Sequence, residues 1–298
     1  MATTNPIKNR IKKLKEEYDA LRGEKEPLLV MIDEVEIPES VYNSNAIENS
    51  TLTLKETEKI LLEMEVQRDV SLREVFEAKN LSRVIAYIRN KTKEKEIDKE
   101  IILFLHQMLI GGIDDNIAGR FRRKGEYVRV GTHIAPAPEH VERTVEEILN
   151  EYLGISEAYF IDKIAKFHLD FETIHPFCDG NGRIGRALMN YQFLRLGFPS
   201  VIIRNKEKKY YYKAFNDYRD NKNTKTMEKI AALALMESLH KRITYLKGEK
   251  IITLSEYTRQ HKKSAPALLN AARRQNLPAF REKGVWEIGE DFRYKERG

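Results

Sequence analysis

Residues 183–196, RIGRALMNYQFLRL, carry apolar side chains nearly all round the helix that their period predicts. A helix of this kind has no face suited to water and is buried at the centre of a bundle. The same helical period appears in other segments of the chain, namely residues 7–30, 71–95, 98–113, 139–153, 162–174 and 207–245. We therefore expect a mainly α protein.

Several segments interrupt this helical pattern. Gly23 and Pro27 break the first helix, a polar stretch follows Pro38, and the helical period resumes between residues 54 and 70. Between Arg120 and Pro138 the period is replaced by short apolar alternation around a Lys-Gly turn signal, which predicts a β-hairpin or flap.

The last fifty residues predict a separate small module. Two short helices, with Ser255 and Ser264 as candidate N-caps, precede a hairpin that turns at Lys283 and Gly284. Two helices followed by a hairpin form a winged helix-turn-helix pattern. We expect three regions: an N-terminal helical region at 1–95, a core at 96–246 and the winged helix-like module at 250–298.

The overall composition points to a soluble protein of the cytoplasm. No stretch reaches the roughly 20 apolar residues that span a bilayer, and the charged N-terminus does not resemble a signal peptide. Cys178 is the only cysteine, so an internal disulfide is excluded. The net charge of +6 is compatible with anionic partners, although most charges fit solvated helix surfaces. The sequence is also compatible with a homo-oligomer.

A loop of small residues precedes the buried helix. Gly180, Asn181 and Gly182 allow backbone amides to approach a ligand closely, and a helix N-terminus directly after them favours an anion. Arg183 and Arg186, three residues apart, are placed to add bidentate contacts to phosphate. The loop therefore predicts a phosphate site.

Together with the glycines, three residues that precede them form a candidate catalytic set. Asp179 is a candidate Mg²⁺ ligand, because one carboxylate shared with phosphates and waters is how proteins usually hold this ion. His175 can accept a proton from a hydroxyl, and Phe177 is expected to anchor the loop in the core. The alternative is a glycine-rich turn that caps a helix, with His175 a core histidine.

The whole string HPFCDGNGRIGR, residues 175–186, resembles the Fic family motif HxFx(D/E)GNGRxxR at every defined position. Fic proteins have a helical core with a hairpin flap and mostly transfer AMP from ATP to Ser, Thr or Tyr hydroxyls of proteins. The resemblance implies that His175 is the general base and Asp179 the Mg²⁺ ligand. It also implies that the GNG residues hold the phosphates, with Arg183 and Arg186 on the β and γ phosphates.

The same resemblance assigns further parts of the chain. It implies that residues 128–138 form the flap that binds a target protein by strand addition. Tyr211 and Tyr212 resemble an aromatic pair near the adenine, and a core role for one or both is an equal alternative. The intact GNGR argues against the kinase variant of the family, whereas transfer of another phosphate-linked group, such as phosphocholine, stays open.

A second motif, SNAIEN at residues 44–49, matches the family's inhibitory pattern (S/T)xxxE(G/N), placed before the core as in its second class. The resemblance implies that Glu48 pairs with Arg186 and excludes the γ phosphate, while Ser44 lies on the same face of a short helix. A capping box or an exposed turn is the alternative interpretation.

Three rival functions also follow from the sequence. Residues 250–298 are predicted to bind DNA, with Arg273, Arg274, Arg281 and Lys283 available for phosphates, and protein recruitment or a packing role is the alternative. Removal of AMP from modified proteins would use the same catalytic residues. Metal-dependent hydrolysis through His168, Asp170 and His175 is weaker, because these residues do not follow a recognised ligand spacing.

Overall fold

The computed structural model describes residues 3–66, 69–92, 94–131, 133–154 and 157–293. The chain forms two compact units, and each is described by itself. Unit 1 contains Ile37–Ala231 with the first three residues, and unit 2 contains Thr4–Glu36 and Ala232–Gly298. The division into regions 1–95, 96–246 and 250–298 stays a prediction.

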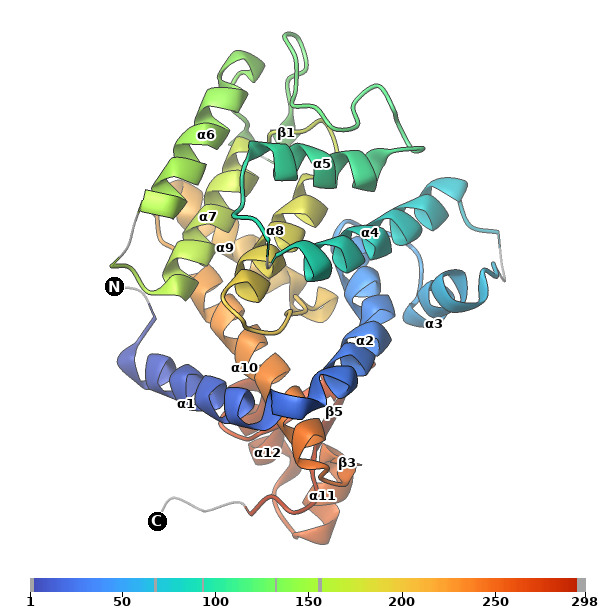
Figure 1. Cartoon of the computed structure of the whole chain (residues 1–298), viewed down its shortest axis with the longest axis vertical. Helices are drawn as coiled ribbons and strands as arrows, with labels where there is room; N and C mark the ends of the chain where they lie inside the picture. Colours follow the sequence, from blue (N-terminus) through green and yellow to red (C-terminus); the bar gives the residue numbers. More distant parts are fainter. Residues whose placement is uncertain (1–2, 67–68, 93, 132, 155–156, 294–298) are drawn as a thin grey trace. The chain divides into compact units, whose positions relative to one another are not determined.

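Unit 1 is a helical bundle with one short hairpin (Figure 1). Its elements are the later part of α2 (Glu26–Ile47), α3 (Leu54–Glu58), η2 (Lys59–Glu63), α4 (Leu72–Lys91), α5 (Lys99–Ile110), β1 (Arg129–Val130), β2 (His133–Ile134), α6 (Pro138–Gly154), α7 (Phe160–Ile174), α8 (Asn181–Arg195), η3 (Asn205–Glu207), α9 (Lys208–Asn221) and the start of α10 (Lys225–Lys247).

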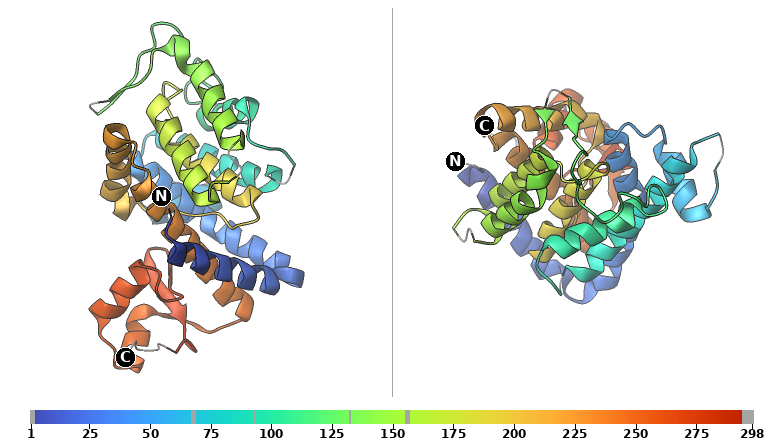
Figure 2. Two further views of the ribbon diagram at one scale, coloured as in Figure 1. Left: turned by 90° about the vertical axis from the view of Figure 1, so that its left-hand side faces the viewer. Right: turned by 90° about the horizontal axis from the view of Figure 1, so that it is seen from above.

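Helix α8 lies at the centre of this bundle, as its apolar sequence predicts. It packs against α4, α5 and α7 and buries Ile184, Leu188 and Tyr191 completely. The same core includes Phe171 of α7 and Phe177 of the following loop. Helix α6 packs against α7 (Figure 2). The loop between α7 and α8 is therefore held between two buried helices.

Helix α2 differs from the sequence prediction, because it continues through Pro38 to Ile47 instead of ending in a polar stretch. A proline inside a helix removes one backbone hydrogen bond and typically costs about 3 kcal/mol. Val41 and Ile47, both fully buried, supply compensating apolar burial on the segment after the proline. Ser44 consequently lies on a regular helix.

Two other boundaries also differ. The helix that begins at Leu54 ends at Glu63 after a π-helical turn, and Met64 adopts a left-handed conformation, so the helix does not reach Val70. The hairpin is much shorter than the predicted 120–138, since only residues 129–130 and 133–134 pair among the described residues. In the segment before the hairpin, the buried guanidinium of Arg122 donates hydrogen bonds to backbone carbonyls.

Unit 2 combines α1 (Asn5–Arg22), η1 (Gly23–Lys25), the start of α2 and the end of α10 with the C-terminal segment. That segment contains β3 (Ile251–Thr253), α11 (Leu254–Gln260), α12 (Ala265–Arg273), β4 (Phe280–Glu282) and β5 (Val285–Gly289). The three strands form an antiparallel sheet in the order β3-β5-β4. The two predicted helices and the hairpin that turns at Lys283 and Gly284 are present.

Of the two predicted N-caps, Ser264 occupies the cap position and Ser255 does not. Thr253, not Ser255, caps α11 through its side chain, which accepts from the amide of Glu256 at 3.1 Å. Ser264 occupies the N-cap position of α12, but its side chain makes no capping hydrogen bond. The cap of α11 therefore comes from the last residue of β3, a strand that the sequence pattern did not reveal.

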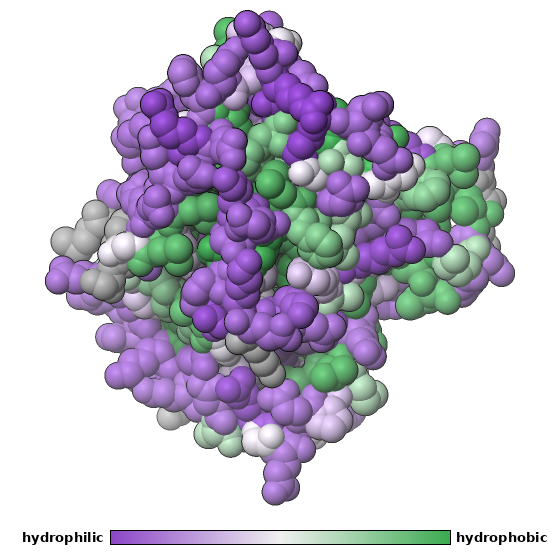
Figure 3. All heavy atoms as spheres, turned by 45° about the horizontal axis from the view of Figure 1, so that its top comes forward, coloured by the Kyte–Doolittle hydropathy of each residue, from purple (hydrophilic) through white to green (hydrophobic). Residues whose placement is uncertain are grey.

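The face shown in Figure 3 is mostly hydrophilic and carries several groups of apolar side chains. One group of exposed apolar side chains lies on and next to α3 and η2. The exposed apolar residues of this region include Leu62, Met64, Val66 and Leu72. None of the helices in the described part of the chain is both long enough and apolar enough to cross a membrane.

Candidate active site

The loop between α7 and α8 is fixed from inside the core. Phe177 is fully buried and stacks on the ring of His106, with ring centroids 3.7 Å apart. The side chain of Asn181 clamps the loop, because it accepts from the Phe177 amide at 2.9 Å and donates to the Phe177 carbonyl at 2.8 Å. Any contact of Asn181 with a phosphate would therefore come from its backbone amide.

Gly180 gives this loop its close packing. It adopts a left-handed conformation at φ 78°, and a Cβ at this position would lie 3.0 Å from Leu109 Cδ2. Helix α8 begins at the next residue, so its first amides open toward a cavity of about 920 Å³. Unpaired amides at a helix N-terminus attract anions.

His175 lies at the C-terminal end of α7, in a left-handed conformation that directs it into the same cavity. Its Nδ1 lies 3.3 Å from the backbone carbonyl of Glu172, which favours a proton on Nδ1 and a lone pair on Nε2. Burial lowers the pKa of His175 to about 4, against opposing contributions from the Glu172 carbonyl and Glu48. The imidazole is thus neutral at pH 7 and able to accept a proton.

Asp179 lies in a group of alternating charges at the other end of the loop. It contacts the guanidinium of Arg73 from α4 and lies 3.2 Å from Arg183, while Glu77 lies 3.1 Å from both arginines. Burial alone would raise the pKa of Asp179, but Arg183, the Gly180 amide and Arg73 outweigh it and lower that pKa. Asp179 is therefore an ionised carboxylate that faces the cavity.

This carboxylate fits the way in which Mg²⁺ is usually held. The ion commonly binds one or two carboxylates together with substrate phosphates and waters, so a site of this kind needs no cage of protein ligands. Among the described residues, His, Cys, Asp and Glu side chains form no group of three that could hold a metal. Asp179 beside the amides of α8 is the arrangement that suits a metal bound together with phosphate.

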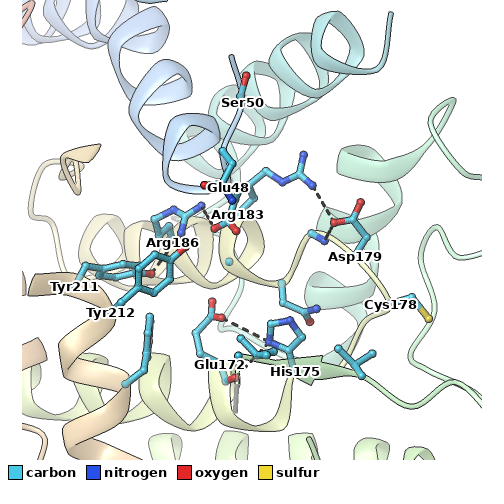
Figure 4. Close-up of a pocket in the computed structure, with 18 of the residues that line it drawn as sticks. Glu48, Ser50, Glu172, His175, Cys178, Asp179, Arg183, Arg186, Tyr211 and Tyr212 are labelled. Atoms are coloured by element: carbon cyan, nitrogen blue, oxygen red, sulfur yellow. Dashed lines mark hydrogen bonds and ion pairs between the residues drawn. The ribbon is translucent and has the colours of Figure 1, made fainter. Parts of the chain in front are cut away.

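Arg186 is buried and points to the opposite side of the cavity from Arg183 (Figure 4). Its Nε donates to Ser44 Oγ at 3.0 Å, and its Nη2 donates to the Ser44 carbonyl at 2.9 Å and to Glu48 Oε1 at 2.8 Å. A Cβ on Gly182 would overlap the Glu48 carboxylate. Glu48 therefore lies directly against the first turn of α8, where an anion would bind.

The two tyrosines of the KKYYYKAF segment differ in their surroundings. Tyr211 is fully buried, and its hydroxyl lies 2.7 Å from His168 Nε2 and 3.5 Å from Arg186 Nη1. Tyr212 is partly exposed and donates to the Ile47 carbonyl at 3.0 Å. Both line the cavity, Tyr211 as a support for Arg186 and Tyr212 as part of the wall.

Other predicted residues are engaged elsewhere. Asp170 lies 2.7 Å from Lys166 and accepts from Tyr218, and His168 is bonded to Tyr211. The hairpin contributes Val128, Arg129, Val130 and Gly131 to the wall of the cavity.

Sequence reasoning missed three residues of the site, namely Glu172, Arg73 and Arg122. Glu172 lies three residues before His175, and this helical spacing is the signal that points to it. Arg122 donates to the His175 carbonyl at 2.8 Å and to the Ile174 carbonyl at 3.2 Å, so it fixes the end of α7. No comparable sequence signal identifies Arg73, whose partner Asp179 lies 106 positions away.

The sequence is similar to those of known proteins. Residues 96–193 match the Fic/DOC family. A protein adenylyltransferase Fic from Nematostella vectensis is 34% identical over 181 residues, which cover 59% of this chain and 42% of that protein. One from Drosophila erecta is 36% identical over 176 residues, which cover 58% and 35%. The chain therefore spans less than half the length of these curated relatives.

Solved structures share the fold. A Fic domain containing signaling protein from Bacteroides thetaiotaomicron superimposes with a TM-score of 0.71 at 24% identity and covers 81% of this chain and 98% of that one. Fic-1 from C. elegans gives a TM-score of 0.67 at 25% identity and covers 81% and 71%.

Proposed function

We propose that the chain, whose residues 96–193 match the Fic/DOC family, transfers AMP from ATP to a Ser, Thr or Tyr hydroxyl of a target protein. One observation carries the proposal: a single cavity joins a neutral histidine, an ionised carboxylate and the N-terminus of a buried helix with two arginines. This set supplies a base, a metal ligand and a phosphate site. Pyrophosphate is the leaving group.

The residues have separate tasks in this reaction. The target hydroxyl attacks the α-phosphorus of ATP, and its proton moves to Nε2 of His175. The bond between the α-phosphorus and the bridging oxygen breaks, and pyrophosphate leaves with the electron pair. Arg183, Arg186 and the amides of residues 180–182 stabilise the charge on the phosphates, a task of positioning and electrostatics. Asp179 would hold Mg²⁺, which neutralises phosphate charge when bound.

We propose that Glu48 inhibits this reaction. Its carboxylate competes with phosphate for Arg186 and lies against the amides of α8. ATP must therefore displace one negative charge before its γ phosphate can pair with Arg186. Ser44 supports the same arginine through both its hydroxyl and its carbonyl.

Mass spectrometry tests the transfer and the inhibition together. The wild-type protein, Glu48→Gly, His175→Ala and the double variant are each incubated with ATP, Mg²⁺ and a cell lysate. We expect the mass of AMP on protein hydroxyls, more of it with Glu48→Gly, and none when His175 is replaced. Glu94→Gly is the matched control, because Glu94 lies in an exposed turn away from the cavity. Equal labelling by wild type and Glu48→Gly would refute the inhibition.

Two related reactions use the same residues. Removal of AMP from a modified protein requires water in place of the target hydroxyl, and incubation with an AMP-modified protein distinguishes it from transfer. Other phosphate-linked donors, including a phosphocholine donor, are separated by the mass that they add. The flap at 128–138 is the proposed site for the target, since Ile134 is exposed there.

A second partner is proposed for residues 250–298, and duplex DNA fits their charge better than a protein. Arg273 and Arg274 are exposed at the end of α12 and form no ion pair within the described residues. Arg281, by contrast, pairs with Glu237 at 2.6 Å, so the prediction that it is available for phosphates is wrong. Binding of the full chain to a DNA duplex across salt concentrations tests this, with the slope against log salt falling by about 2 when both arginines become alanine.

Two further proposals rest on the sequence. A location in the cytoplasm is proposed because Cys178 is the only cysteine, which suits a reducing compartment. Formation of a homo-oligomer stays a prediction, which the mass of the protein in solution tests.

A further inference from the structure

Glu172 points into the cavity between His175 and Arg186 (Figure 4). Its Oε2 lies 3.8 Å from His175 Nδ1, beside its own backbone carbonyl at 3.3 Å from the same nitrogen. Its Oε1 is buried and has no hydrogen-bond partner among the described residues. This oxygen lies so close to α8 that a Cβ on Gly185 would overlap it. A buried carboxyl oxygen without a partner calls for an explanation.

We propose that Glu172 is a positioning residue for His175 in the transfer reaction, an inference that rests on the proposed function. The backbone carbonyl of Glu172 accepts from Nδ1 and its carboxyl group lies 3.8 Å from the same nitrogen, which leaves Nε2 to face the target hydroxyl. When the hydroxyl proton moves to Nε2, the carboxylate stabilises the imidazolium across the short distance to Nδ1. Glu172 itself exchanges no atom or electron pair with the substrate.

The surroundings of Glu172 link this role to the inhibitory glutamate. Burial first, and then the charge of Glu48, raise the pKa of Glu172 to about 8, against the opposing effect of Arg186. With Glu48 in place, Glu172 is therefore mostly protonated at pH 7 and gives the imidazolium no charge support. When Glu48 leaves, a repelling charge is removed and Arg186 remains, so the carboxylate form is favoured.

The charged and titratable groups around these two side chains come from several elements. The groups that face them are the carboxylate of Glu48, the guanidinium groups of Arg122 and Arg186, and the imidazole of His133. Of these, Glu48 is the group that ATP must displace from Arg186 in the proposed inhibition. Removal of Glu48 is therefore the change that shifts Glu172 from its protonated form to its carboxylate form.

The test uses the full chain with Glu48→Gly as the parent. Glu172→Gln keeps the shape of the side chain and removes its charge, whereas Glu172→Asp keeps the charge on a shorter side chain. Asp170→Asn is the matched control, because this carboxyl lies on the same helix and pairs with Lys166 instead of His175. The readouts are kcat and KM for ATP across the neutral pH range, and the titration of His175 by NMR of ¹⁵N-labelled histidine.

We expect Glu172→Gln to lower kcat by about 10- to 100-fold, part of the effect of a general base, with KM for ATP changed less than about twofold. The NMR midpoint of His175 falls with Glu172→Gln in the parent, and it does not move when Glu48 is present. Glu172→Asp recovers part of kcat, and Asp170→Asn keeps the parent's kcat.

Two results would overturn the proposal. One is a Glu172→Gln variant whose kcat and His175 titration both match the parent. The other is an equal loss of kcat in Asp170→Asn, since the effect would then come from the helix as a whole. If the parent transfers no AMP at all, the adenylyltransferase proposal fails, whereas the NMR titration still reports on the contact between Glu172 and His175.

Discussion

Replacing Glu48 with glutamine tests whether the ion pair with Arg186 competes with ATP. The substitution keeps the length of the side chain and a carbonyl oxygen that can accept from Arg186 Nη2, so it removes mainly the charge. Arg186 keeps its two hydrogen bonds to Ser44. The effect of Glu48→Gln therefore isolates the electrostatic part of the contact between Glu48 and Arg186.

The geometry sets the size of this effect. The contact is 2.8 Å long, with the Arg186 side chain 6% exposed and the Glu48 side chain 35% exposed. A hydrogen bond to a charged group typically contributes about 1.5–3 kcal/mol. Because Glu48 is more than a third exposed, solvent screening reduces this to about 1 kcal/mol. We expect the free energy of unfolding to fall by this amount in the absence of nucleotide.

The same interaction opposes ATP, so its loss has a second, opposite consequence. ATP no longer has to displace the charge of Glu48, and about 1 kcal/mol corresponds to roughly fivefold tighter binding. The loss of stability and the gain of affinity should therefore agree in size. Urea denaturation measures the first, and calorimetric titration with a non-hydrolysable ATP analogue and Mg²⁺ measures the second.

Glu94→Gln is the control for this pair of measurements. Glu94 forms an exposed ion pair with Lys91 at 2.7 Å, and removal of its charge should change neither quantity measurably. If Glu48→Gln lowers stability without tightening binding of the analogue, the ion pair is structural only. If it changes neither, the reasoning from the contact geometry is wrong.

Three further changes test other parts of the site. Gly185→Ala places a methyl group on Glu172 Oε1, and urea denaturation should show a loss of about 1–3 kcal/mol from overpacking, whereas an unchanged midpoint would contradict the close contact. Arg122→Ala leaves four backbone carbonyls without their donor, which should cost about 3 kcal/mol or more and reduce transfer in the same preparation. Burial lowers the pKa of His106 to about 4 and of His168 to about 3, from 6.5. The unfolded chain therefore binds more protons below pH 6.5, and thermal melts should show stability falling as the pH drops from 6.5 toward 4, whereas a flat Tm would refute the burial of neutral imidazoles.

Much of the fold follows from local patterns in the sequence. The apolar residues of α8 have a helical period and no polar face, and such a segment is stable only inside a bundle. The departures lie where local signals compete with tertiary packing. Pro38 is a helix-breaking signal, yet α2 continues through it because the residues that follow are buried against the core. Among the described residues around the Lys-Gly signal no strands pair, because Arg122 ties that segment to the end of α7.

The sequence by itself determined which residues form the loop of the candidate site, since His175, Asp179 and the glycines lie within eight positions of one another. It also suggested Glu48 as a partner for Arg186, through a motif. The contact of these two side chains, 138 positions apart, was decided by the packing of α2 against α8. Tertiary structure alone placed Arg73 on Asp179 and made Glu172 a buried carboxyl beside His175. The physical reason is that pKa values and ion pairs depend on burial and on neighbours in space, and neither is recorded in the local order of residues.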